Sequence, residues 1–315
     1  MKILYIYKDY KKRRKQYGQI MESLGHKVYF LEIKDKKAKN NIKIKDIKKQ
    51  SVDAVWFYSP FYIKNNPEAV NYILSKKILL ILYGQYNPQV PYPEWIDIWN
   101  KPDFLFVQNK EFNDYLQSKN LNSYYIPFGF HQDQYYKTIK EKKYDVSFAG
   151  TALPRNSAKK DKRSVYLRSL EGYNIRVFGS TFKDRVGSIT VKSYKDHKQQ
   201  RSIYGKTKIN LDVPFFHTKP DFYRDKIHIK NRLFEVPATN NFLLTLKCPE
   251  FLDIFPEDTI GYYEDSIESL KENINKYLKD KKIRIKMAKK AYKLVYEKHT
   301  FVHRFKEMFK ILRNG

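Results

Sequence analysis

Short apolar runs alternate with longer amphipathic stretches along most of this 315-residue chain, and no other feature constrains its fold as strongly. In the first 130 residues the apolar runs predict strands, and the amphipathic stretches between them predict helices. The expected strands are 2–7, 27–33, 53–58, 77–83, 103–108 and 123–128, and the expected helices are 11–24, 67–75 and 110–119. This order predicts an α/β domain with a parallel sheet and crossover helices.

The same alternation restarts after residues 131–143, a polar segment without hydrophobic periodicity that we expect to be a linker. The later strands are expected at 144–150, 174–179, 208–213, 241–245 and 259–264, and the helices at 161–171, 194–204, 227–238, 265–279, 282–297 and 301–312. Two successive open α/β domains are therefore predicted, over 1–135 and 144–300, with a cleft between them. Ligands in such sheets bind outside the carboxyl ends of the strands.

The net charge indicates which classes of binding partner the chain favours. Lysine and arginine number 62 against 34 acidic residues, a formal charge of +28. Such a charge favours nucleic acid, an acidic membrane surface or an anionic glycan, although a lysine-rich coding bias explains the same number. One cysteine excludes an internal disulfide framework. The N-terminus becomes charged too early for a signal peptide, and the apolar run 78–83 is too short to span a bilayer. These features predict a cytoplasmic protein, with the inner membrane surface as a further expected location.

A first candidate site follows the strand expected at 144–149. Gly150 at the strand end would let backbone N–H groups approach a phosphate closely. Thr151 comes next, and Arg155 is the first of several cations that would add positive potential. The helix start that follows would supply further donors. The same pattern also fits an ordinary connection with solvated lysines.

A second candidate site is the stretch NRLFEVPATNNFLLT, residues 231–245. Arg232 and Glu235 are three residues apart, which places them on one face of a helix. A glutamate there can accept two hydrogen bonds from a ribose diol, and an arginine can bind phosphate oxygens. Lys230 is a second cation beside them. The alternative is a surface ion pair that binds no ligand.

This stretch resembles the signature of the group 1 glycosyltransferases, in the branch related to the spore-coat protein CgeB. Further matches follow the family's order: YDVSFAG at 144–150, NIRVFGS at 174–180 and EKHTFVHRF at 297–305. In the first half, PDFLFVQNKEFNDYLQSKNLNSYYIPFGF at 102–130 resembles the stretch that leads to the interdomain connection. The resemblance extends over about 144–312 and is thinner before residue 100.

The resemblance implies a GT-B fold, in which two Rossmann-like domains face a cleft and residues 301–315 form a helix that returns to the first domain. It also implies a nucleotide-diphosphate sugar donor, with a UDP-sugar favoured. Carried over by position, Glu235 would hold the ribose and Arg232 the pyrophosphate. The remaining donor-side positions are Gly150 and Thr151 at the phosphates, and Gly179 and Ser180 near the base.

Two departures from the family leave the stereochemistry of transfer open. Many retaining members have a second glutamate eight residues before the ribose glutamate, where this chain has Ile227. The more distantly similar phage DNA glucosyltransferases invert configuration, with an aspartate base after a central strand of the first domain. The nearest stretch here, Tyr83-Gly84-Gln85, lacks that aspartate.

The acceptor side is expected at the loop KDYKKRRK, residues 8–15, in which six of eight residues are basic. A cationic loop suits an anionic acceptor such as a lipid-linked saccharide, a cell-envelope glycan or DNA, although it also fits a solvated first turn of a helix. The expected acceptor-binding residues are Tyr10, Lys11, Lys12, Arg13 and Arg14. Asp9 is the candidate base, because an inverting transfer needs one near the acceptor hydroxyl.

Gln85, in the aromatic and proline-rich loop 83–95, is the second catalytic candidate. The chain has no D-x-D motif and no combined cysteine and histidine spacing typical of a metal site, so we expect neither a metal nor another cofactor. The sequence thus predicts a metal-independent glycosyltransferase that moves a sugar to an anionic acceptor. The alternatives are a phage-type DNA-base glucosyltransferase and a protein that binds a sugar nucleotide or nucleic acid without transfer.

Overall fold

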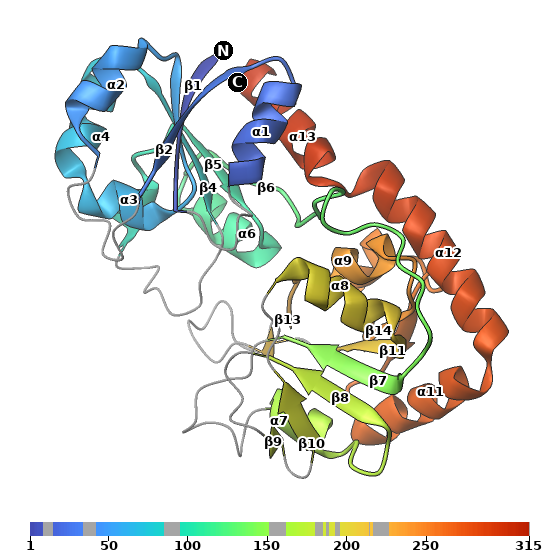
Figure 1. The fold of residues 1–315 in the computed structure, drawn as a ribbon. Coiled ribbons are helices and arrows are strands. Elements are labelled where there is room, and N and C mark those ends of the chain that lie inside the picture. The colour runs from blue at the N-terminus through green and yellow to red at the C-terminus, as the bar shows by residue number, and fades with distance from the viewer. Residues whose placement is uncertain are drawn as a thin grey trace. The chain divides into compact units, whose positions relative to one another are not determined.

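The computed structural model describes residues 1–8, 15–33, 42–84, 95–150, 162–179, 185–186, 189–192, 196–213, 215–216 and 227–314. These residues form two α/β units. The first contains the described residues of 1–127 together with 301–314, and the second contains those of 128–300. Each unit has its own sheet and is described by itself (Figure 1).

The sheet of the first unit has six strands in the order β2-β1-β3-β4-β5-β6, all of them parallel. Its strands are β1 (Lys2–Tyr7), β2 (Lys27–Glu32), β3 (Ala54–Phe57), β4 (Leu79–Gly84), β5 (Phe104–Val107) and β6 (Ser123–Tyr125). Strands β3 and β5, with sequences AVWF and FLFV, are buried along their whole length. Continuous apolar strands of this kind are expected where helices cover both faces of a parallel sheet.

The helices of the first unit include one from the far end of the chain. Those from its N-terminal part are α1 (Lys15–Ser23), α2 (Ile44–Gln50), α3 (Pro60–Asn65), α4 (Pro67–Ser75), α5 (Ile96–Trp99) and α6 (Lys110–Ser118). The last helix, α13 (Phe301–Asn314), buries Phe305, Met308 and Phe309 in the same core. The Phe305 ring lies 5.6 Å from that of Trp56 in β3. The predicted return of the C-terminal helix to the first domain is therefore confirmed.

The sheet of the second unit has the order β15-β14-β11-β7-β8-β10-β9. Its strands are β7 (Tyr144–Ala149), β8 (Ile175–Phe178), β9 (Arg185–Val186), β10 (Ile189–Lys192), β11 (Thr207–Asp212), β14 (Leu243–Leu246) and β15 (Gly261–Tyr263). All neighbours are parallel except β9 and β10. After β7 the chain adds β8 on one side of β7, and it later adds β11 on the other side of β7. The carboxyl ends of β7 and β11 thus form a topological switch point, where open α/β sheets bind ligands.

The helices of the second unit are α7 (Lys162–Arg168), α8 (His197–Gly205), α9 (Arg232–Ala238), α10 (Pro249–Ile254), α11 (Ile267–Lys279) and α12 (Lys281–Lys298). The helix expected at 227–238 begins only at Arg232. Residues Ile227–His228 instead form strand β13, which pairs with β12 (Phe215–Phe216), so the earlier part of that prediction is wrong. Among the described residues, no helix combines the length and the apolar character needed to cross a bilayer.

Residues 131–143 contain no helix or strand, yet they pack on the helices of the second unit, to which they belong. Tyr135 is buried, and its hydroxyl donates to Gln200 Oε1 at 2.8 Å. Thr138 N–H donates to the Thr239 carbonyl at 3.0 Å. This segment therefore covers α8 and the end of α9 before the chain enters β7.

Candidate functional site

A buried carboxylate marks the switch point of the second unit. Asp212 is the last residue of β11, and its side chain is 3% exposed. Arg232 Nη1 donates to Asp212 Oδ1 at 2.5 Å, and Thr245 Oγ1 donates to Oδ2 at 3.2 Å. The Tyr263 hydroxyl donates to the Asp212 carbonyl at 3.2 Å. Burying a charge is costly unless it is paired and hydrogen-bonded, and both conditions hold here.

Arg232 is held in place by its neighbours on β7. Its guanidinium lies 4.4 Å from the centre of the Phe148 ring. A Cβ atom added to Gly150 would overlap Nη2 of the same guanidinium. Glycine at the end of β7 therefore provides the space that Arg232 occupies.

The amides of Gly150 and Gly179 both form hydrogen bonds within the second unit. The Gly150 N–H donates to the Phe178 carbonyl at 2.8 Å, and the Gly179 N–H donates to the Lys192 carbonyl at 3.0 Å. The positions expected of these residues, near the phosphates and near the base, stay predictions.

Two further cations surround Asp212. Lys230 is half-buried, and burial, reinforced by Arg163 and opposed by Asp212, lowers its pKa to about 7. Arg163 is buried at the start of α7, and its Nε donates to the Val213 carbonyl at 3.0 Å. The cluster thus holds three basic side chains and one carboxylate, which leaves it with excess positive charge for an anion.

One donor in this cluster has no acceptor within the described part of the chain. The Arg232 Nε is buried, and among the described residues it makes no hydrogen bond. Buried N–H groups in native proteins are nearly always paired. An unpaired donor on a guanidinium suits a ligand with charged oxygen atoms.

Glu235 lies one helical turn further along α9, and it is only 4% exposed. Its Oε2 accepts from Gln200 Nε2 at 3.3 Å and from the Tyr204 hydroxyl at 3.4 Å. Arg232 pairs with Asp212 rather than with Glu235. The alternative of a surface ion pair between Arg232 and Glu235 is therefore wrong, because both side chains are buried.

The other predicted site residues lie outside the described part of the chain. They are Asp9, Tyr10, Lys11, Lys12, Arg13, Arg14 and Gln85 on the acceptor side, and Thr151, Arg155 and Ser180 on the donor side.

Sequence reasoning missed Asp212, Gln200 and Tyr204. Asp212 had a detectable signal, because it is the single acidic residue in the strand-like run KINLDV. Gln200 and Tyr204 are spaced i, i+4 on α8, but nothing local connects them with Glu235, some thirty residues later.

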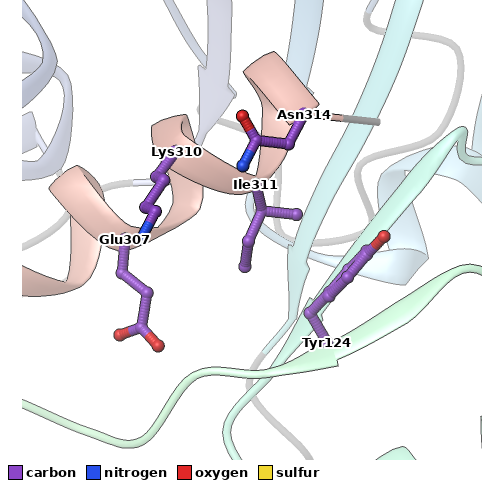
Figure 2. Close-up of a pocket in the computed structure, with 5 residues that line it drawn as sticks. All are labelled: Tyr124, Glu307, Lys310, Ile311 and Asn314. Carbon is purple, nitrogen blue, oxygen red and sulfur yellow. The ribbon is translucent and has the colours of Figure 1, made fainter.

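A separate pocket lies in the first unit, between α13 and β6. It is lined by Tyr124, Glu307, Lys310, Ile311 and Asn314, which Figure 2 shows around the end of α13. Its lining includes one ammonium, that of Lys310, and one carboxylate, that of Glu307, both on α13, so the lining has no excess of positive charge. The chemistry that suits a diphosphate is found in the second unit instead.

Comparisons with known proteins agree with this architecture. Residues 163–310 match a family model described as glycosyl transferase-like. No curated protein sequence matches the chain. The fold is similar to that of sucrose-phosphate synthase from Thermosynechococcus elongatus, with a TM-score of 0.69 at 11% identity over 100% of this chain and 98% of that chain.

Two further solved structures are similar along nearly their whole length. A glycosyltransferase from Rickettsia africae has a TM-score of 0.67 at 12% identity, over 99% of this chain and 98% of that one. HepE from Anabaena, solved in complex with UDP and glucose, has a TM-score of 0.63 at 10% identity, over 99% of both chains. The predicted fold, two Rossmann-like domains of the GT-B type, is confirmed by these similarities.

Proposed function

We propose that this chain, a glycosyltransferase of the GT-B fold, takes its sugar from a nucleotide-diphosphate donor, with a UDP-sugar favoured. The observation that carries the proposal is the buried cluster at the switch point, where Arg232, Lys230 and Arg163 surround Asp212. The complex of the similar HepE with UDP and glucose supports the choice of nucleotide.

The assigned roles follow from charge and position. Arg232 and Lys230 bind the diphosphate, since they bring positive charge to the carboxyl end of β11. As the bond from the anomeric carbon to the diphosphate oxygen breaks, negative charge grows on the leaving group, and fixed cations stabilise it. We propose that this step needs no metal.

Glu235 binds the ribose diol through its carboxylate. Gln200 and Tyr204 both donate to Oε2, and they fix the orientation of the side chain. A carboxylate can accept hydrogen bonds from both hydroxyls of a ribose diol. Glu235 lies one helical turn after Arg232, so the two side chains leave α9 on the same face.

The experiment that tests the donor site is Glu235→Gln, which keeps the size of the side chain. We expect the affinity for the preferred sugar nucleotide to fall about 10-fold or more, because hydrogen bonds to a charged group are worth about 1.5–3 kcal/mol. Isothermal calorimetry with UDP-, GDP- and ADP-glucose measures this, and a thermal scan checks the fold. The exposed Glu272→Gln on α11 is the matched control. Unchanged affinity in Glu235→Gln would overturn the ribose assignment.

The acceptor is proposed to be an anionic, sugar-containing molecule, on the basis of the +28 charge and the cationic loop 8–15. Exchange of Lys11, Lys12, Arg13 and Arg14 for glutamine together should lower acceptor turnover at least about 10-fold and leave donor affinity unchanged. Turnover is measured with lipid-linked saccharides, teichoic-type polymers and duplex DNA as acceptors. An equal loss of donor affinity would place the loop at another site.

A further inference from the structure

The exposed face of α12 is strongly basic. Nine of its side chains are exposed, and they comprise seven lysines, one isoleucine and one glutamate. Lys290 pairs with Asp258, and Lys293 lies 3.8 Å from Glu297. Asp258 also interacts electrostatically with Lys286. Among the described residues, no acidic side chain forms an ion pair with Lys281, Lys282 or Lys289, which lie near the start of the helix with Lys286.

The neighbouring helix shows that this charge is local. On α11 the exposed side chains are two glutamates, two lysines and one asparagine, so that face carries no net charge. A coding bias toward lysine would act on both helices alike. The concentration of lysine on α12 therefore calls for its own explanation.

The segment 136–143, with sequence YKTIKEKK, runs beside α12 and extends the basic surface. The Tyr296 hydroxyl donates to the Tyr135 carbonyl at 2.9 Å, which joins the C-terminal half of α12 to the start of the segment. At the other end, the charge of Arg284 contributes to the lowered pKa of Lys142. Figure 1 shows the green chain following α12 on its way into β7. Lys137, Lys140 and Lys143 are exposed along it.

Two isoleucines are exposed within this basic surface. Ile139 is 69% exposed and Ile285 is 45% exposed, so both present apolar side chains to solvent. Surfaces that lie on an anionic bilayer typically combine lysines with exposed aliphatic side chains. There the ammonium groups meet lipid phosphates, and the apolar groups enter the boundary between head groups and acyl chains.

We propose that the surface formed by α12 and residues 136–143 binds the head groups of an anionic phospholipid bilayer. Nucleic acid fits these side chains less well. The isoleucines cannot stack on bases, and the exposed cations named here are all lysines rather than the arginines that make bidentate contacts. Segment 136–143 enters the sheet at the amino end of β7, whereas the Asp212 cluster lies at the carboxyl ends of the strands. Bilayer binding therefore leaves the donor site of this unit accessible.

Co-sedimentation of the full chain with vesicles tests the proposal. We expect binding to vesicles of 70% phosphatidylcholine and 30% phosphatidylglycerol, weakening as salt rises, and little binding to pure phosphatidylcholine. Exchange of Lys281, Lys282, Lys286 and Lys289 for glutamine should lower the partition coefficient about 100-fold or more, since each lysine near an anionic surface contributes about a factor of five. The control replaces four exposed lysines of the first unit with glutamine, and it should retain more binding than the α12 variant. These lysines are Lys43, Lys45, Lys49 and Lys76.

The apolar contribution is tested separately. Ile139→Ser with Ile285→Ser should remove the binding that persists at high salt, while Leu74→Ser with Val165→Ser, at exposed fractions of 38% and 39%, should not. Donor affinity should be unchanged in every variant, so a result that contradicts bilayer binding can be told apart from one that contradicts the donor site. Equal losses in the two lysine sets would overturn the proposal. So would equal binding to both vesicle types, or displacement from vesicles by duplex DNA without any effect of the isoleucines.

Discussion

The two sheets share a parallel architecture but differ in what they bury at their strands. In the first unit, the interior around β3, β4 and β5 is apolar and aromatic, with Trp56, Phe106 and Tyr83 among its largest buried side chains. In the second unit, the carboxyl ends of β7 and β11 bury Arg232, Asp212 and, nearby, Glu235.

This difference separates what the fold requires from what a ligand requires. In the first sheet, β3, β4 and β5 contain no charged residue, and the buried charge near them is that of Arg304 on α13, beside Tyr83. Buried ion pairs contribute little net stability, because desolvation offsets the attraction. The charged groups of the second sheet are therefore not needed to build it, and their presence at the switch point is the reason why we propose that this unit binds the donor.

The largest expected effect comes from breaking the buried pair. Arg232→Met leaves the Asp212 carboxylate buried without its partner, which should lower the free energy of unfolding by about 3–5 kcal/mol. Donor affinity should fall about 100-fold, as expected for a charge-assisted phosphate contact. Urea unfolding and calorimetry measure the two quantities.

The double variant Arg232→Met with Asp212→Asn separates stability from binding. Removing both charges should restore most of the lost stability, because no unpaired ion remains. It should not restore donor affinity. If the double variant binds the sugar nucleotide as tightly as the parent chain, Arg232 does not contact the donor. The buried charges of the second sheet would then not be explained by donor binding.

A smaller effect is expected from two glycines that are crowded in the same way, one in each unit. A Cβ on Gly150 would overlap the Arg232 guanidinium, and a Cβ on Gly18 in α1 would overlap the Phe30 ring. Each change to alanine should lower the free energy of unfolding by about 1–3 kcal/mol through overpacking. Only Gly150→Ala should also weaken donor binding, by about 10-fold, or 1.4 kcal/mol. Equal affinities in the two variants would show that the space at Gly150 serves packing alone.

Much of the fold could be predicted, because its signals are local. The strands at 2–7 and 144–149 follow from apolar runs, and helix 67–75 has the expected bounds, since Pro67 starts it. The helix expected from residue 227 was too long. Its first residues pair as a strand with Phe215–Phe216, and helical spacing does not reveal a tertiary contact of that kind.

The site was predictable only in part, because its geometry joins distant segments. The signature around Glu235 pointed to the correct helix. It could not show that Arg232 pairs with Asp212, twenty residues earlier, or that Gln200 and Tyr204 orient Glu235. The role of Gly150 depended on which side chain fills the space above it, which only packing reveals.

The smallest effect on stability, and the sharpest in pH, is expected at Lys230. Its pKa is about 7 in the folded chain, against about 10.4 for an unfolded lysine. Between these values the unfolded chain binds more protons, so this side chain makes stability rise with pH. Lys230→Met should remove that slope and stabilise the chain near pH 7 by roughly 0.5–2 kcal/mol.

Donor binding should shift the pKa of Lys230 in the opposite direction to burial. A bound diphosphate raises the pKa of Lys230 again, so binding should take up a proton between about pH 7 and 10. Calorimetry in buffers of different ionisation enthalpy counts that proton, and Lys230→Met should bind about 10-fold more weakly without it. Lys142→Met is the matched control, because burial lowers the pKa of Lys142 to about 8 while its ammonium donates to Gly205 and Asn241 away from the cluster. Proton uptake that persists in Lys230→Met, or disappears in Lys142→Met, would remove Lys230 from the donor site.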